Sequence, residues 1–315
     1  MRTNSPMSLR RRARRRLRKN RKKRRSQRML AIYKKELRAY FNSLIGWLFL
    51  AFFLAFVGVY VYLYNMMKGY SYIGYALSSI NFVFILLVPM VTMRIMAEEK
   101  RQKTDQLLLT APISVWKIVL GKYLAMVTLT GVGMLSICVY PLVLARFGVV
   151  NFGMSYMAIF GLFMVSCAYL AIGLFISSLT ESQAFAAVMT FIVVLITCLA
   201  DGIANLIPPT AKAAWITYSV LWVLISVWMW RVMKNATVAL LVFAIGESIL
   251  SVVYLLNGTL LEGTVKTVLG SLAILNVYGQ TVGGVFELRM PVYYLSIAFV
   301  FCFLTYQNIR KRRYS

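Results

Sequence analysis

The chain has 315 residues, of which 60% are hydrophobic, and soluble globular proteins contain only about 45–50% apolar residues. This composition excludes an ordinary soluble domain and predicts an all-α polytopic membrane protein, because helices satisfy their own backbone groups in lipid. The net charge is +26, and histidine is absent, which excludes His-based acid–base catalysis and His metal sites. The four cysteines lie in apolar runs without a CxxC spacing, so we expect no catalytic and no metal-binding residues.

Residues 1–28 are rich in Lys and Arg and contain no acidic residue. Such a block of like charge repels itself and is expected to be disordered. In a membrane protein this favours a cytoplasmic tail that binds anionic lipid headgroups, and an arm that binds nucleic acid is the less favoured alternative.

Residues 29–43 form an amphipathic segment before the first apolar run. Its apolar residues recur at helical spacing, with basic residues between them: Leu30, Tyr33, Leu37, Tyr40 and Phe41, against Lys34, Lys35 and Arg38. This pattern is typical of a helix that lies in the plane of the membrane interface.

The membrane domain is expected at residues 44–309, followed by a basic tail at 310–315. A helix needs about 20 apolar residues to cross the hydrocarbon core of a bilayer. This criterion predicts eight spans, at residues 44–64, 80–97, 118–145, 155–179, 184–207, 215–233, 235–257 and 291–309. The sixth and seventh join at a tight basic turn, Arg231–Lys234, so they are either two full spans or a partly re-entrant hairpin.

The distribution of Lys and Arg sets the expected orientation. With both termini in the cytoplasm, few basic residues lie outside: Lys68, Arg146, Lys212, Lys266 and Arg289. The positive-inside rule therefore predicts cytoplasmic N- and C-termini.

A charged segment separates the second and third predicted spans. Two pairs spaced four residues apart, Glu99 with Lys103 and Arg101 with Asp105, are expected to face each other on one helix. Pro112 ends that helix, and Ser114 is placed to cap the next one. The segment is therefore predicted to be a stiff helix–turn–helix loop on the cytoplasmic side, with its charged residues exposed.

The sequence of this loop, EEKRQKTDQLLLTAPISVWKIVLGKYLA, resembles the cytoplasmic loop of ABC-2 family transporter permeases, most closely those of the gliding-motility and nitrous-oxide-accessory type. The residues that fit the pattern are Glu98, Glu99, Thr104, Leu107, Leu108, Pro112, Ile113, Ser114, Gly121 and Lys122. Lys103 stands where the pattern has glycine, and Gln106 where it has glutamate. The resemblance covers about residues 29–200 and 276–313, so the sixth and seventh spans are interpreted as an inserted pair.

The resemblance implies a type V exporter transmembrane domain with 6–8 transmembrane helices, an interfacial elbow helix and a cytoplasmic coupling helix. It implies a separate ABC ATPase subunit that carries ATP and Mg²⁺, with no cofactor in this chain, and a homodimer or heterodimer with a second permease in a bacterial or archaeal cytoplasmic membrane. The ATPase-coupling loop would consist of Glu98, Glu99, Arg101, Lys103, Thr104, Asp105, Leu107, Leu108, Pro112 and Ser114.

No P-loop motif accompanies these features. Gly121-Lys122-Tyr123 lacks the hydroxyl residue that a P-loop requires, so the chain is not expected to hydrolyse ATP itself.

Two acidic residues fall inside predicted spans and form a possible intramembrane polar site. Glu247 lies in the middle of the seventh span, where a hydrogen bond to Ser248 or Ser251 is favoured over contact with a substrate. Asp201 lies near the outer end of the fifth span, within reach of water.

The alternative function is a membrane scaffold or assembly factor that recruits a soluble partner through the same loop without transport. A secondary transporter ranks lower, because the chain shows no inverted repeat and few acidic residues for proton coupling. A neighbouring gene for an ABC ATPase would favour the exporter.

Overall fold

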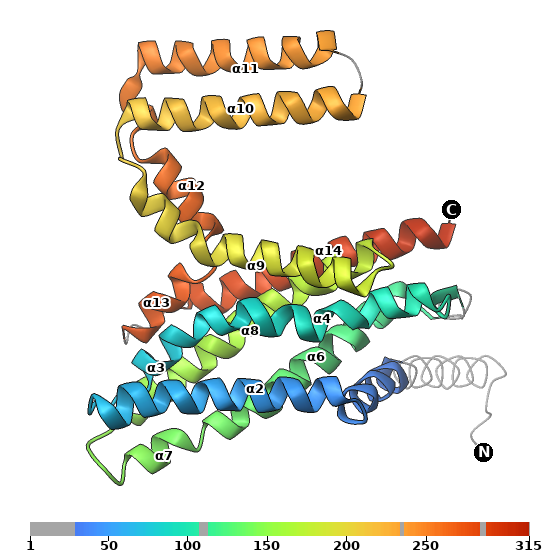
Figure 1. Ribbon diagram of the computed structural model, residues 1–315, viewed down its shortest axis with the longest axis vertical. Helices are drawn as coiled ribbons and strands as arrows, with labels where there is room; N and C mark the ends of the chain where they lie inside the picture. The colour runs from blue at the N-terminus through green and yellow to red at the C-terminus, as the bar shows by residue number, and fades with distance from the viewer. Residues whose placement is uncertain (1–28, 107–112, 234–235, 284–287, 315) are drawn as a thin grey trace, which may run out of the picture. The chain divides into compact units, whose positions relative to one another are not determined.

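The computed structural model describes residues 29–106, 113–233, 236–283 and 288–314, and this part of the chain is all-helical (Figure 1). It divides into two compact units: unit 1 is Met1–Leu195 with Val277–Ser315, and unit 2 is Ile196–Asn276. The predicted polybasic tail, residues 1–28, lies outside the described residues.

Unit 1 begins with a helix over residues 29–41, called here the amino-terminal helix. It continues with α2 (Leu44–Val61), the π-helix η1 (Tyr62–Met67), α3 (Gly74–Ser79), the 3-10 helix η2 (Ile80–Val83), α4 (Phe84–Arg101), α6 (Val115–Ile137), α7 (Tyr140–Leu144), α8 (Phe152–Leu179), the first part of α9 (Gln183–Leu206), most of α13 (Asn276–Val282) and α14 (Arg289–Tyr314).

Helix α8 forms the centre of unit 1, where it packs against α4, α6 and α14 (Figure 1). In α8, 78% of the most apolar segment is buried, against at most 39% in the other candidate spans. Small residues let neighbouring helices approach α8 closely, as is common in membrane proteins. Helix α4 lies directly against α8 at Gly173. A Cβ atom added to this glycine would overlap the side chain of Thr92 in α4.

We expect Gly173→Ala to destabilise the protein by about 1–3 kcal/mol, because the new methyl group forces α4 and α8 apart in a packed core. Gly202→Ala in α9 is the matched control, since nothing lies within 4 Å of the methyl group it would add. There we expect a gain of up to about 1 kcal/mol, because alanine favours a helix more than glycine does. Thermal unfolding of both variants in detergent measures the difference, and equal stabilities would contradict the close contact.

Unit 2 contains the remainder of α9, followed by α10 (Ala211–Met233), α11 (Ala236–Leu256), the 3-10 helix η3 (Gly258–Leu261) and α12 (Thr264–Leu272). Helices α10 and α11 pack against each other as a hairpin. A small apolar cluster joins its end to η3 and α12, with Ala214, Leu261 and Val265 as its buried members.

Six stretches of the described residues are long and apolar enough to cross a membrane: Leu44–Met67, Val115–Leu144, Phe152–Leu179, Gln183–Leu206, Ala211–Arg231 and Arg289–Arg313. Each overlaps one predicted span. A bent pair, Leu240–Leu256 with Gly258–Ser271, would be a seventh if it counts as one span, and the chain bends by 116° between its two parts. The predicted span at 80–97 contains η2 and most of α4. Because α4 ends in several charged residues, it is not among these six stretches, and the span at 80–97 stays a prediction.

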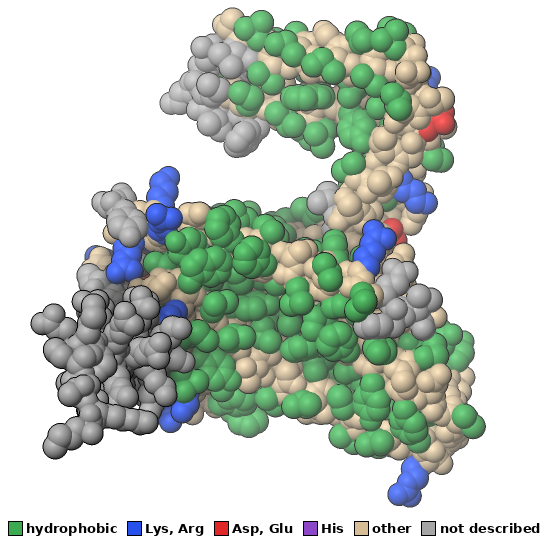
Figure 2. Space-filling view, turned by 180° about the vertical axis from the view of Figure 1, so that it is seen from behind, with side chains coloured by type: hydrophobic (Ala, Val, Ile, Leu, Met, Phe, Trp, Pro, Cys, Tyr) green, Lys and Arg blue, Asp and Glu red, His purple; other side chains and the backbone are tan. Residues whose placement is uncertain are grey.

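The surface agrees with insertion in lipid. Figure 2 shows a face of unit 1 on which hydrophobic side chains predominate, with Lys and Arg at its margins. Leu135, Phe185, Leu295 and Phe299 are among the large apolar side chains that are more than half exposed. Exposed apolar surface of this extent is rare on soluble monomers, and it supports a multi-pass membrane protein.

Candidate functional site

The loop between α4 and α6 begins with a Schellman motif. Helix α4 ends at Arg101. The amide of Lys103 then donates to the carbonyl of Lys100 (3.0 Å), and the amide of Thr104 donates to the carbonyl of Glu99 (3.0 Å). This motif requires a left-handed residue after the helix, and Lys103 occupies that place with φ = 56°. The predicted i,i+4 pairs Glu99–Lys103 and Arg101–Asp105 do not form, because the helix has ended before their second members.

The left-handed backbone suits the glycine that the permease pattern has at this position, since glycine adopts this conformation without a Cβ clash. We therefore expect Lys103→Gly to stabilise the protein by about 1 kcal/mol. Lys103→Ala removes the same charge but keeps the Cβ atom, so it should bring no gain. Thermal unfolding of the two variants separates backbone strain from charge, and equal stabilities would argue against strain at this residue.

The start of α6 carries a lysine that is fully buried. The Nζ atom of Lys122 lies 3.0 Å from Oε1 of Glu36 and 2.8 Å from Oε2 of Glu99, and it donates to the carbonyl of Ile95 (2.8 Å). Lys35, which is largely exposed, pairs with the other oxygen of Glu99 at 3.0 Å. This set, called here the Lys122 network, joins the amino-terminal helix, the end of α4 and the start of α6.

The neighbouring glycine brings these helices close enough for the network to form. An added Cβ atom at Gly121 would lie 3.1 Å from Cγ2 of Ile32 in the amino-terminal helix. The buried side of the amino-terminal helix consists of Ile32, Glu36 and Tyr40. Leu30, which was expected on the apolar face, is half-exposed. Tyr40 donates to the carbonyl of Val91 (2.8 Å), which fixes the same helix to α4.

A groove of about 390 Å³ follows the junction of the amino-terminal helix with α4, and the charged residues Glu36, Arg94, Glu98 and Glu99 are among those that line it. Glu98 pairs with Arg94 one turn earlier. Glu98 and Glu99 are therefore partly buried and paired within the protein, and the expectation that they are exposed is wrong.

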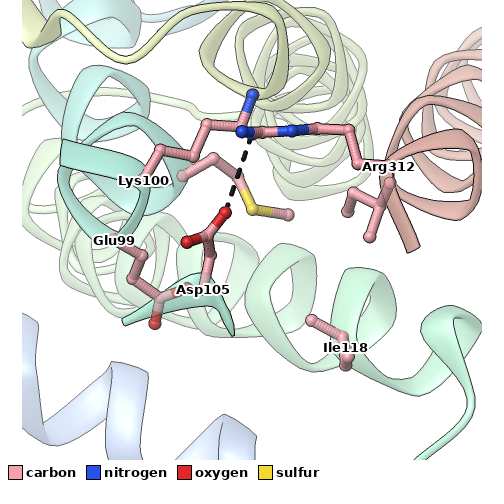
Figure 3. Close-up of a pocket in the computed structure, with 7 residues that line it drawn as sticks. Glu99, Lys100, Asp105, Ile118 and Arg312 are labelled. Atoms are coloured by element: carbon pink, nitrogen blue, oxygen red, sulfur yellow. Dashed lines mark ion pairs between the residues drawn. The ribbon is translucent and has the colours of Figure 1, made fainter. Parts of the chain in front are cut away.

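The far side of the loop meets α14. Figure 3 shows Arg312 reaching from α14 toward Asp105, with Glu99 and Lys100 coming from α4. These residues line a small cavity of about 30 Å³. The Nη1 atom of Arg312 lies 3.6 Å from Oδ2 of Asp105. Ser114 stands at the N-cap position of α6, as predicted, but its side chain makes no capping hydrogen bond.

Two pKa values at the end of α4 are lowered, for different reasons. Burial alone raises the pKa of the Glu99 carboxyl, but the charge and hydrogen bond of Lys122, reinforced by Lys35, outweigh burial and hold it below its usual value. Burial and the positive charge of Arg312 lower the pKa of the Lys100 ammonium to about 8. Burial disfavours the charged form of both side chains, and only Glu99 has enough opposite charge beside it to outweigh this effect.

The remaining predicted loop residues divide into two groups. Arg101, Lys103 and Thr104 are exposed and available to a partner. Leu107, Leu108 and Pro112 lie outside the described residues, so the apolar part of the predicted loop stays a prediction.

The two acids predicted as an intramembrane polar site, Glu247 and Asp201, each have a different hydrogen-bond partner. Glu247 accepts a hydrogen bond from Ser219 of α10 (2.8 Å), so its partner is on the facing helix and not Ser248 or Ser251. Ser248 instead donates to the carbonyl of Ala244 (2.6 Å). Asp201 accepts from Asn276 (3.0 Å), also within unit 2. Each acid thus links segments of unit 2.

Sequence reasoning assigned no role to Glu36, Lys122 or Arg312. One signal was available for Glu36, which is the single acid in a basic amphipathic helix and lies one turn from both Ile32 and Tyr40. Its partner is 86 residues away, and no sequence spacing identifies it. Within the described residues, no three His, Cys, Asp or Glu side chains are grouped so as to hold a metal ion.

Comparison with protein families gives a match to a transporter family. A family model described as "ABC-2 family transporter protein" matches residues 30–218, more than half of the chain. No curated protein matches the sequence. The matched range includes the amino-terminal helix, the α4–α6 loop and the Lys122 network, and the chain therefore belongs to the ABC-2 family of transporter proteins.

Proposed function

We propose that the chain is the membrane-spanning permease subunit of an ABC exporter, which moves its substrate with ATP hydrolysed by a separate ATPase subunit. The observation that carries this proposal is the family match over residues 30–218, which starts at the amino-terminal helix and extends into α10. The multi-pass helical architecture supports it.

In this proposal ATP and Mg²⁺ bind to the ATPase, and this chain holds neither, since it has no P-loop motif. The chain pairs with a second permease, identical or related. Both termini face the cytoplasm of a bacterial or archaeal cell, and the basic residues before the amino-terminal helix bind anionic lipid of the cytoplasmic membrane.

The ATPase docks on the α4–α6 loop. The exposed cations Arg101 and Lys103 provide the charged contact, and the structure supplies a route for force from there. Movement at the end of α4 acts on Lys122 through Glu99 and on the amino-terminal helix through Glu36. Because one buried ammonium holds both carboxylates, we expect the three helices to move together.

Reconstitution tests this function. The tagged chain is purified from its native membrane, the ABC ATPase that co-purifies is identified, and both subunits are placed in proteoliposomes. We expect hydrolysis to require both subunits, and a cysteine introduced at Lys68 to change its labelling rate when ATP is bound. If the ATPase binds but the labelling rate stays unchanged, the alternative function as a membrane scaffold is favoured. If no ATPase co-purifies with the chain, the proposal is overturned.

A further inference from the structure

Helix α14 contacts the α4–α6 loop on both sides of residues 107–112. Before that segment, Arg312 pairs with Asp105 (3.6 Å). After it, Nη1 of Arg313 donates to the carbonyl of Ile113 (3.0 Å). Two consecutive residues at the carboxy-terminal end of α14 therefore hold the two described ends of the loop.

The same end of α14 also holds the turn between α8 and α9. The second guanidinium nitrogen of Arg312 lies 3.3 Å from Oε1 of Glu181. One helical turn earlier, Asn308 donates to the carbonyl of Ser178 (2.7 Å), which also accepts from Lys100 of α4. These bonds satisfy a carbonyl that the end of α8 leaves without an intrahelical donor.

Aromatic packing continues this contact into the first turn of α6. The Trp116 ring stacks on that of Tyr306 in α14, with centroids 4.8 Å apart and planes inclined by 13°. Phe299 and Phe303 of α14 face the same indole at 6.2 Å. The exit of the loop is thus packed against α14 over several turns.

We propose that the carboxy-terminal turn of α14 is part of the ATPase-docking unit, with Arg312 and Arg313 as positioning residues for the α4–α6 loop. This inference rests on the proposed function and adds the last helix of the chain to the docking unit. When the ATPase pushes on the loop, the displacement reaches α14 and the α8–α9 turn through Arg312, in parallel with the Lys122 network.

A guanidinium suits this position because its planar fork can pair with two carboxylates at once, which an ammonium does less well. Arg312 is 39% exposed and Glu181 66%, so the pairs contribute little to stability. A purely structural role would therefore change little on substitution. A positioning role would weaken ATPase binding while the unfolding temperature stays constant.

The test compares variants of the full chain in nanodiscs, with the affinity of the co-purified ATPase as the readout. We expect Arg312→Ala to weaken binding about fivefold and Arg312→Asp about tenfold or more, because the new carboxylate faces Asp105 and Glu181. Arg312→Lys should fall between Ala and the wild type. Lys212→Ala is the matched control, since it removes one positive charge from an exposed residue of unit 2, which is not part of the docking unit, and should leave the affinity unchanged.

Hydrogen exchange supplies a second readout on the permease alone. In Arg312→Ala we expect faster exchange at residues 102–106 and 113–115. The exchange of charges, Asp105→Arg with Arg312→Asp, should restore binding in part, since Glu181 keeps its charge. Unchanged affinity and exchange in every Arg312 variant would overturn the inference. A wild-type chain that binds no ATPase would instead overturn the proposed function.

Discussion

We expect Lys122→Met to destabilise the protein by about 3–5 kcal/mol, because removal of one partner leaves buried charges without compensation. Lys122 is fully buried, and Glu36 and Glu99 both direct an oxygen to its ammonium. In the variant these two carboxylates face each other across an apolar side chain of similar length. The measurement is thermal or denaturant unfolding of the purified chain.

Two further variants identify the cause. Lys35→Met removes a cation from the same carboxylates, but that side chain is 61% exposed, so the loss should be about 1 kcal/mol or less. Combining Lys122→Met with Glu36→Gln and Glu99→Gln removes the buried charges together and should recover most of the lost stability. A triple variant no more stable than Lys122→Met would mean that the lysine acts through packing.

The pH dependence of stability provides an independent test of the Lys122 network. In the wild type the folded pKa of Glu99 lies below the ordinary value of 4.5, so its contribution is present above that pH and is lost as the pH falls through the folded pKa. In Lys122→Met the main charge that lowers the pKa of the Glu99 carboxyl is gone, so burial raises this pKa in the folded state. Acidification should therefore destabilise the wild type and partly restore the variant.

The helices were predictable because the length of an apolar run is a local property. The candidate spans from Leu44 to Met67 and from Phe152 to Leu179 are nearly continuous apolar segments, and charge separates the loop from both neighbours. The position of the loop and the N-cap position of Ser114 follow from the same local signals. The family match confirms the family that the loop sequence indicated.

Partners across the fold were not predictable. The i,i+4 rule assumes that a helix continues, and the left-handed residue Lys103 ends α4 before Glu99 and Asp105 can use it. Both acids then pair with bases far along the chain, Glu99 with Lys122 and Asp105 with Arg312. For a similar reason the sequence indicates a partner for Glu247 on its own helix, whereas Ser219 faces it from α10.

The burial of Glu98 and Glu99 changes which loop residues can meet a partner. The carboxylates are held by Arg94, Lys122 and Lys35, so the charge that a docking protein meets at the end of α4 is positive. Arg101 and Lys103 supply it, and both are exposed. An ATPase that binds here would present acidic residues to them.

We therefore expect the double variant Arg101→Glu with Lys103→Glu to weaken ATPase docking on the order of a hundredfold, because like charges then face each other and cost several kcal/mol. The loss of stability should remain below about 1 kcal/mol, since only favourable charges at a helix C-terminus are lost. Docking is measured as the affinity of the co-purified ATPase for the chain in nanodiscs.

Lys212→Glu with Lys266→Glu is the matched control, because it changes the net charge equally through two exposed lysines of unit 2. It should leave the affinity unchanged. The affinity of the Arg101 and Lys103 double variant should also recover when acidic residues of the ATPase are reversed to lysine, which charge complementarity requires and misfolding would not allow. If both double variants weaken docking equally, the attraction comes from the overall charge of the chain. The α4–α6 loop would then not be the site of contact.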